Sequence, residues 1–161
     1  MKKKLFAIAL LTLVFALTLS ACGSKKDAAS PAEAEAEEEV TVNGLSIQLK
    51  DLTEEPAFVD WEQDGIAMQL IALVNGDGEA QLAYNTCQSC AGSPYAYFEY
   101  ANGLLTCQNC GNRFGLDSVG IIAGGCNPKP LGAYSVEGDV IVVPEEELAA
   151  VAPEFETWKK F

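Results

Sequence analysis

Two Cys-x-x-Cys pairs constrain this chain more than any other feature of its sequence. Cys87 and Cys90 form the first pair, and Cys107 and Cys110 form the second after an interval of 16 residues. Two residues between thiols let a tight turn direct both sulfurs at one ion, and a hairpin between the pairs brings them face to face. Gly111 supports this interpretation, because a residue without a Cβ accepts positive φ and lets backbone N–H groups point at sulfur. The spacing predicts a four-thiolate site for zinc, iron or an iron–sulfur cluster.

The absence of histidine narrows the chemistry of this site. None of the 161 residues is histidine, which excludes Cys₂His₂ zinc, Rieske-type ligation and His-ligated haem. It also removes the usual general base for a nucleophilic cysteine. Ligands that are all sulfur favour zinc, iron–sulfur or Cu(I). The sequence therefore predicts a metal-binding protein or an electron carrier, and not an enzyme.

Disulfide bonds are the main alternative role for these cysteines. The N-terminal sequence predicts export, and thiols outside the cytoplasm tend to be oxidised. A Cys-x-x-Cys pair also suits reversible exchange in a thiol–disulfide redox protein. However, five cysteines follow Cys22, which is an odd number, and the paired turns are typical of metal knuckles. We therefore favour a bound metal over structural disulfides, and both over thiol exchange.

The first 22 residues predict a lipid anchor. Three lysines at positions 2–4 precede an apolar run over residues 5–17, which has the length of a signal peptide and is short for a bilayer span. The run leads to Leu-Ser-Ala-Cys, ending at Cys22, which resembles the lipobox of bacterial lipoproteins. We interpret residues 1–21 as a lipoprotein signal peptide and Cys22 as the lipidation site. The protein is then expected on the extracytoplasmic face of the cell membrane.

Residues 22–39 are predicted to form a disordered acidic tether behind the lipidated cysteine. Their Ala, Glu and Ser residues offer no apolar face, so the segment buries too little surface to become ordered. Without residues 1–21 the chain has 7 basic and 23 acidic side chains, a net charge of −16. Such a charge excludes a general nucleic-acid surface and suits a basic redox partner.

Residues 40–161 are predicted to form one mainly β domain, with antiparallel strands and a ribbon-like metal-knuckle insertion. Period-two alternation between turn residues identifies the strands. The predicted strands are residues 40–42 and 45–49 around an Asn-Gly turn, then 57–61, 66–74, 79–85, 95–100, 104–107, 133–136 and 140–143. Pro144 and three following glutamates predict a short C-terminal helix, which Pro153 ends or interrupts. Trp158 and Phe161 are expected to be packing anchors.

A fifth cysteine in the predicted domain, Cys126, lies in the sequence Gly-Gly-Cys-Asn-Pro. The glycines free the backbone to approach a bulky anionic group, and Pro128 and Pro130 stiffen the segment that follows. Cluster ligands are often followed closely by proline. The alternative is a small buried hydrophobe in a tight turn. The residues alone leave both roles open.

Three segments together resemble the FtrD-like membrane iron–sulfur protein family over about residues 40–150. These segments are NTCQSC, LLTCQNCGNRFGLDSVG and GGCNPKPL. The resemblance implies an iron–sulfur cluster, with zinc or Cu(I) as alternatives, and electron transfer linked to a metal-uptake permease for iron or copper. It implies five metal-ligand candidates, with Cys126 as a ligand or an immediate neighbour of the centre: Cys87, Cys90, Cys107, Cys110 and Cys126. Three further residues are candidates for contacts to the ligands, among them the only arginine of the chain: Gly111, Arg113 and Gly125.

Overall fold

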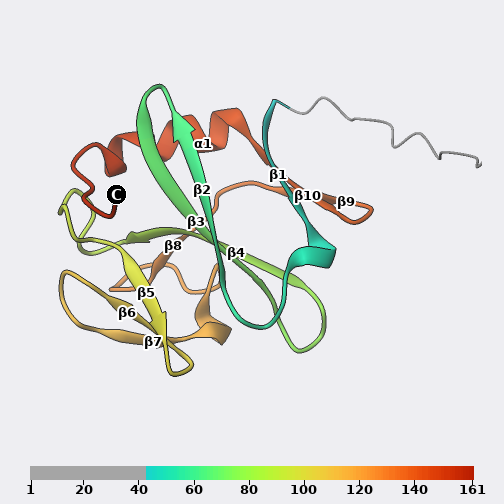
Figure 1. Cartoon of the computed structure of the whole chain (residues 1–161), viewed down its shortest axis with the longest axis horizontal. Helices are drawn as coiled ribbons and strands as arrows, with labels where there is room; N and C mark the ends of the chain where they lie inside the picture. Colours follow the sequence, from blue (N-terminus) through green and yellow to red (C-terminus); the bar gives the residue numbers. More distant parts are fainter. Residues whose placement is uncertain (1–42) are drawn as a thin grey trace, which may run out of the picture. The chain divides into compact units, whose positions relative to one another are not determined.

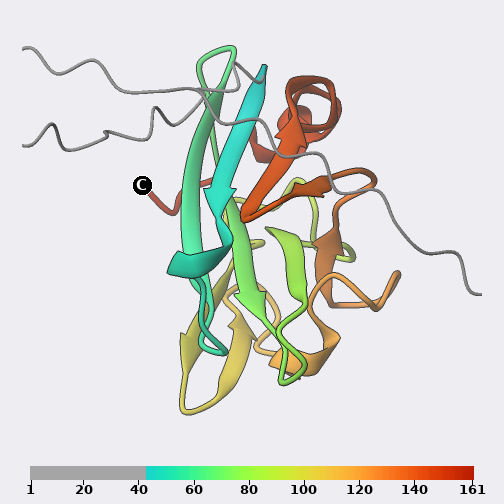
Figure 2. The same cartoon turned by 90° about the vertical axis from the view of Figure 1, so that its right-hand side faces the viewer.

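A computed structural model describes residues 43–161 and is mainly antiparallel β, as the sequence predicts (Figures 1 and 2). The strands are β1 Gly44–Gln48, β2 Ala57–Gln63, β3 Ile66–Val74, β4 Ala80–Cys87, β5 Phe98–Ala101, β6 Leu104–Cys107, β7 Arg113–Gly115, β8 Pro128–Pro130, β9 Ser135–Glu137 and β10 Val140–Pro144. The helix α1 spans Glu145–Val151, and three 3₁₀ turns are η1 Leu49–Asp51, η2 Leu116–Ser118 and η3 Ala152–Phe155.

Several predictions concern residues that lie outside the described part of the chain. These are the signal peptide, the lipidated Cys22, the acidic tether and the strand at residues 40–42. The second half of that first predicted hairpin is present as β1, which pairs with β10. Within residues 43–161, no helix is both long and apolar enough to cross a membrane.

The largest sheet has the strand order β2-β3-β4-β8, with the apolar strand β3 inside it. The β2–β3 hairpin closes at Asp64 and Gly65, whose φ angles are 52° and 79°. Two successive residues with positive φ match the right-handed twist of the paired strands, which explains why Asp-Gly favours this turn. Sequence periodicity missed β8, because its Pro-Lys-Pro sequence is a poor strand pattern. The two prolines of β8 are tolerated because β8 lies at the edge of the sheet.

Strands β3 and β4 separate two hydrophobic cores, because their side chains alternate between the two faces. Leu70 and Tyr84 belong to the first core, with Phe155 of η3 and residues of α1, β1 and β10. Ile71 and Ala83 belong to the second core, with residues of β5 and β6. In Figure 1, α1 and the small β5-β6-β7 sheet accordingly lie on either side of β3 and β4.

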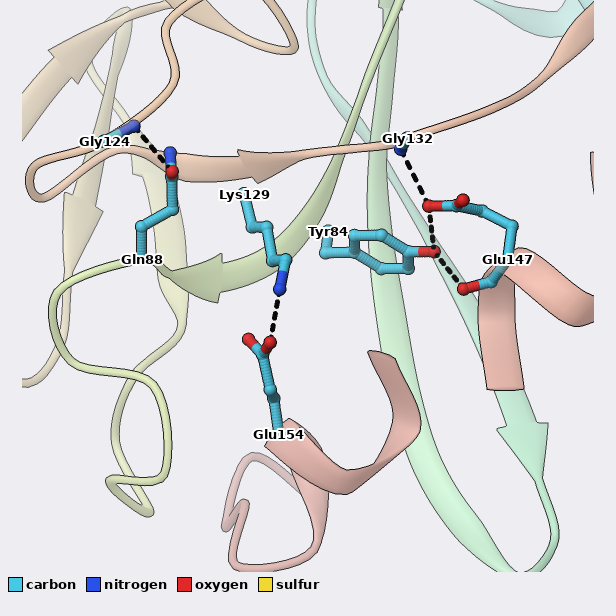
Figure 3. Close-up of polar contacts among 7 residues, drawn as sticks. All are labelled: Tyr84, Gln88, Gly124, Lys129, Gly132, Glu147 and Glu154. Carbon is cyan, nitrogen blue, oxygen red and sulfur yellow. Dashed lines mark hydrogen bonds and ion pairs between the residues drawn. The ribbon is translucent and has the colours of Figure 1, made fainter. Parts of the chain in front are cut away.

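The C-terminal helix is fastened to β4 by a buried tyrosine. The Tyr84 hydroxyl lies 2.9 Å from the Glu147 carbonyl oxygen and 3.1 Å from its carboxylate (Figure 3). The same carboxylate accepts a hydrogen bond from the Gly132 backbone N–H at 2.7 Å. Burial, followed by the nearby Glu147 charge, raises the pKa of Tyr84, so the phenol keeps its proton and remains a donor. Lys129 of β8 and Glu154 of η3 form an ion pair beside this contact.

The last residues fold back onto the loop that follows β4 (Figure 1). The Lys159 backbone N–H donates to the Pro94 carbonyl at 2.9 Å. Trp158 is half-buried and meets Tyr97 and Phe155 edge to face, so it packs as the sequence predicts. The same prediction is wrong for Phe161, which is 70% exposed and whose ring lies edge to face with Trp158.

Gly120 provides a test of how closely the segment after β7 packs against β4. Its φ is 72°, and a Cβ at this position would overlap the Leu82 carbonyl oxygen. Replacing Gly120 with Ala is expected to lower the free energy of unfolding by about 3 kcal/mol, from left-handed strain and overpacking together. The matched control is Gly78→Ala, because Gly78 has a φ of 81° and open space around a Cβ. That control should lose only about 1 kcal/mol. Urea unfolding of both variants measures the difference, and equal losses would contradict the close packing.

Candidate metal centre

Four cysteine sulfurs converge at the junction of the large sheet and the β5-β6-β7 sheet. The sulfurs of Cys87, Cys90, Cys107 and Cys110 all lie within 4.8 Å of one another. Cys87 ends β4 and Cys107 ends β6, and both are fully buried in the second core. Cys90 is half-buried and Cys110 is exposed. The two pairs therefore form one site that is closed on the core side and reaches solvent at Cys110.

The first Cys-x-x-Cys pair forms a turn directly after β4. The Cys90 backbone N–H donates to the Cys87 carbonyl at 3.0 Å, and the Ser93 N–H donates to the Cys90 carbonyl at 2.9 Å. The Cys87 N–H donates to the Ala96 carbonyl at 2.9 Å. The first cysteine is thus held by a strand and by the returning end of its own loop.

The second pair forms a turn directly after β6. Gly111 has a φ of 74°, as the sequence predicts, and its N–H donates to the Cys107 carbonyl at 2.8 Å. The Cys107 N–H donates to the Asn112 carbonyl at 2.9 Å. Arg113 begins β7 and is exposed, opposite Thr106 of β6. In the described part of the chain Arg113 forms no ion pair.

The buried sulfurs are held in an apolar environment that opposes a bare negative charge. Burial raises the pKa of the Cys87 and Cys107 thiols. Backbone N–H groups oppose this effect: those of Ser89 and Cys90 at the Cys87 sulfur lower its pKa, and those of Asn109 and Cys110 act in the same way on Cys107. A metal cation bound by these sulfurs would supply the missing compensation, because a thiol that coordinates a metal releases its proton to solvent.

Direct contacts between the two turns fix their separation. The Ser93 hydroxyl donates to the Asn109 side-chain oxygen at 2.6 Å. The Gln108 backbone N–H donates to the Tyr97 carbonyl at 2.8 Å and so extends the β5–β6 pairing past the end of β6. The chain itself thus places the two sulfur pairs opposite each other.

Asn85 attaches the β5-β6-β7 sheet to the large sheet, and sequence analysis missed it. Pairing between β4 and β8 shifts between Tyr84 and Cys87, and Asn85 lies in this irregular stretch. Its fully buried amide accepts from the Phe98 N–H at 2.7 Å and donates to the Phe98 carbonyl at 3.2 Å. It also donates to the Gln69 side-chain oxygen at 2.7 Å. The available signal was a polar amide inside a buried strand, two residues before Cys87, because such a group needs hydrogen-bond partners.

Gln88 fastens the segment that carries Cys126 to the first turn. Its side-chain oxygen accepts from the Gly124 N–H at 2.6 Å (Figure 3), and its amide nitrogen donates to the Ile122 and Pro128 carbonyls at 3.2 Å each. The Gln88 backbone N–H donates to the Asn127 carbonyl at 3.1 Å. Sequence analysis did not identify this role, because nothing in Cys-Gln-Ser-Cys indicates a contact with a segment some 35 residues later.

Cys126 itself is not in the group of four clustered sulfurs. It is half-buried and packs against the second core, which contains Cys87 and Cys107. Gly125 has a φ of 72°, which lets the segment turn sharply before Cys126. The ligand role that the resemblance implies for Cys126 stays a prediction.

The positioning role of Asn85 can be tested by deletion of its amide. Asn85→Ala removes the partner of the buried Phe98 backbone groups and of the Gln69 side-chain oxygen, so we expect a loss of about 3 kcal/mol in unfolding free energy. The site should also release metal to a chelator faster, because the β5-β6-β7 sheet that carries Cys107 is no longer attached by Asn85 to the strand that carries Cys87. Asn109→Ala is the control, since it removes an exposed hydrogen bond and should cost less than about 1 kcal/mol. Equal losses of unfolding free energy in the two variants would contradict the assignment.

Comparison with known proteins supports the interpretation of this site. The model of the family described as "Membrane iron-sulfur containing protein FtrD-like" matches residues 38–155. No curated protein and no solved structure matches the chain. The matched span contains all four clustered sulfurs, Cys126 and every strand of the described structure. The chain belongs to the FtrD-like family of membrane iron–sulfur proteins.

Proposed function

We propose that this protein is a lipid-anchored, extracytoplasmic electron carrier that binds iron through cysteine thiolates and serves a metal-uptake system. The observation that carries the proposal is the group of four sulfurs within 4.8 Å of one another, in a chain of this family. Sulfur is the donor that iron prefers in electron-transfer sites of this kind. The bound iron would supply a centre that accepts one electron and gives it up again.

The residues around the sulfurs suit electron transfer because they are fixed before any electron moves. Ser93 and Asn109 connect the two turns, and Asn85 connects β4 to β5. A ligand set that is held in place changes little when its charge changes by one unit. Backbone N–H groups at the Cys87 and Cys107 sulfurs stabilise added negative charge, and such hydrogen bonds tune the reduction potential.

The distribution of burial gives the site one face for exchange with a partner. Cys87 and Cys107 are enclosed by the second core, whereas Cys110 is exposed. A redox partner is therefore expected to approach from the side of Cys110. The net charge of −13 of the full sequence favours a basic partner surface through long-range attraction. A lipid on Cys22 would keep the carrier close to a permease in the same membrane.

A structural zinc site is the second candidate, and one observation favours it. Cys87 and Cys107 lie in the core that joins the two sheets, so an ion there would hold the sheets together. Zinc takes four thiolates in such closed sites and contributes directly to folding. The family description names iron–sulfur, which favours the electron carrier.

Anaerobic purification followed by metal analysis tests the proposed function. We expect iron in the protein and a visible chromophore that bleaches on reduction and returns on oxidation. Cys107→Ser is the control, because it removes a buried ligand and should remove both iron and colour. A colourless protein that holds zinc would contradict the electron carrier and support the structural site. A metal-free protein with disulfides in place of the free thiols would contradict both.

A further inference from the structure

The spacing of the four sulfurs bears on how many metal ions they can hold. Four points no more than 4.8 Å apart lie within about 2.9 Å of a common centre. Thiolates bind a tetrahedral ion at about 2.3 Å, which places the sulfurs about 3.8 Å from one another. In the widest arrangement that this limit allows, a regular tetrahedron, an inward shift of each sulfur by about 0.6 Å completes a single-ion site. Rotation of the side chains covers such a shift.

A bridged iron–sulfur cluster places different demands on the same residues. Each iron keeps its own thiolates, and inorganic sulfide fills the space between the irons. Thiolates on different irons consequently point away from one another and lie farther apart than thiolates on one ion. The pair Cys87 and Cys90 would have to move away from the pair Cys107 and Cys110.

Hydrogen bonds oppose that movement of the two turns. The Ser93 hydroxyl would leave the Asn109 side chain, which it now meets at 2.6 Å. The Gln108 N–H would lose its hydrogen bond to the Tyr97 carbonyl, which now has a length of 2.8 Å. Cys107 also pairs with Phe98 in the β5–β6 ladder, and the Phe98 backbone is held by the buried Asn85. Separation of the turns thus breaks contacts on both the exposed and the buried side of the site.

Each of the two turns brings one pair of sulfurs to the site: Cys87 and Cys90 from the turn after β4, and Cys107 and Cys110 from the turn after β6. Two sulfur pairs that face each other supply four ligands, which is the full coordination of a tetrahedral ion. Cys126 lies outside this set, in a segment held by Gln88.

We propose that Cys87, Cys90, Cys107 and Cys110 hold one metal ion without inorganic sulfide. The centre is then mononuclear, in contrast to a bridged cluster that the family description suggests. The inference rests on the proposed function only for the identity of the ion, because iron is required for electron transfer and not for the geometry. The proposed ligand set excludes Cys126, so replacement of Cys126 should leave the ion bound.

Stoichiometry of the anaerobically purified full chain tests the inference. Iron, zinc and acid-labile sulfide are measured per protein for the unaltered chain and for Cys107→Ser and Cys126→Ser. We expect one ion per chain and no acid-labile sulfide. Cys107→Ser should lose the ion, whereas Cys126→Ser should retain it at the level of the unaltered chain. Oxidised protein with iron should show the paramagnetic signal of an isolated ferric ion.

The possible outcomes separate this inference from the proposed function. Two or more irons with a matching amount of sulfide would overturn the mononuclear centre and leave the electron carrier intact. A loss of metal in Cys126→Ser equal to that in Cys107→Ser would also overturn it and would make Cys126 a ligand. One zinc per chain without iron would support the single-ion geometry and overturn the electron carrier.

Discussion

The structure depends on the burial of strand β4, which serves both cores and ends in the metal centre. Its side chains at Leu82 and Tyr84 pack toward α1, and those at Ala83 and Cys87 pack toward β5 and β6. Because side chains alternate along a strand, one segment anchors the helix and delivers the first ligand. The packing of both cores thus fixes the strand that carries Cys87.

The irregular stretch at the end of β4 links the fold to the site. Tyr84 and Cys87 are paired with adjacent residues of β8, although two residues separate them on β4. Such irregularities redirect side chains and are frequent beside functional sites. The additional residues of β4 place Asn85 beside Phe98 of β5. The Asn85 amide there makes the two backbone hydrogen bonds that a neighbouring strand would otherwise make with Phe98. The small sheet that carries Cys107 is thereby set against the strand that carries Cys87.

The centre combines a rigid, buried half with an exposed half. Cys87 and Cys107 lie in the core, where burial disfavours a thiolate and backbone N–H groups offset part of that cost. A bound cation would offset the rest. Cys110 faces solvent, and the turn that carries it is tied to the first turn through Asn109 and Ser93. The site is thus enclosed at Cys87 and Cys107 and open to solvent at Cys110.

Local patterns in the sequence determined the strands other than β7 and β8, the hairpins, the C-terminal helix and the four-cysteine site. The alternation of apolar and polar residues, the Asp-Gly and Asn-Gly turns and the Cys-x-x-Cys spacing each involve only a few neighbouring residues. They can therefore be recognised without knowledge of the fold. Only the tertiary structure decided which side chains hold these parts together. Asn85, Gln88 and Ser93 bind partners 13, 36 and 16 residues away, and no local pattern encodes such pairs. For the same reason the place of Cys126 outside the four sulfurs could not be derived from its glycines and prolines, because ligand geometry is a property of distances between segments.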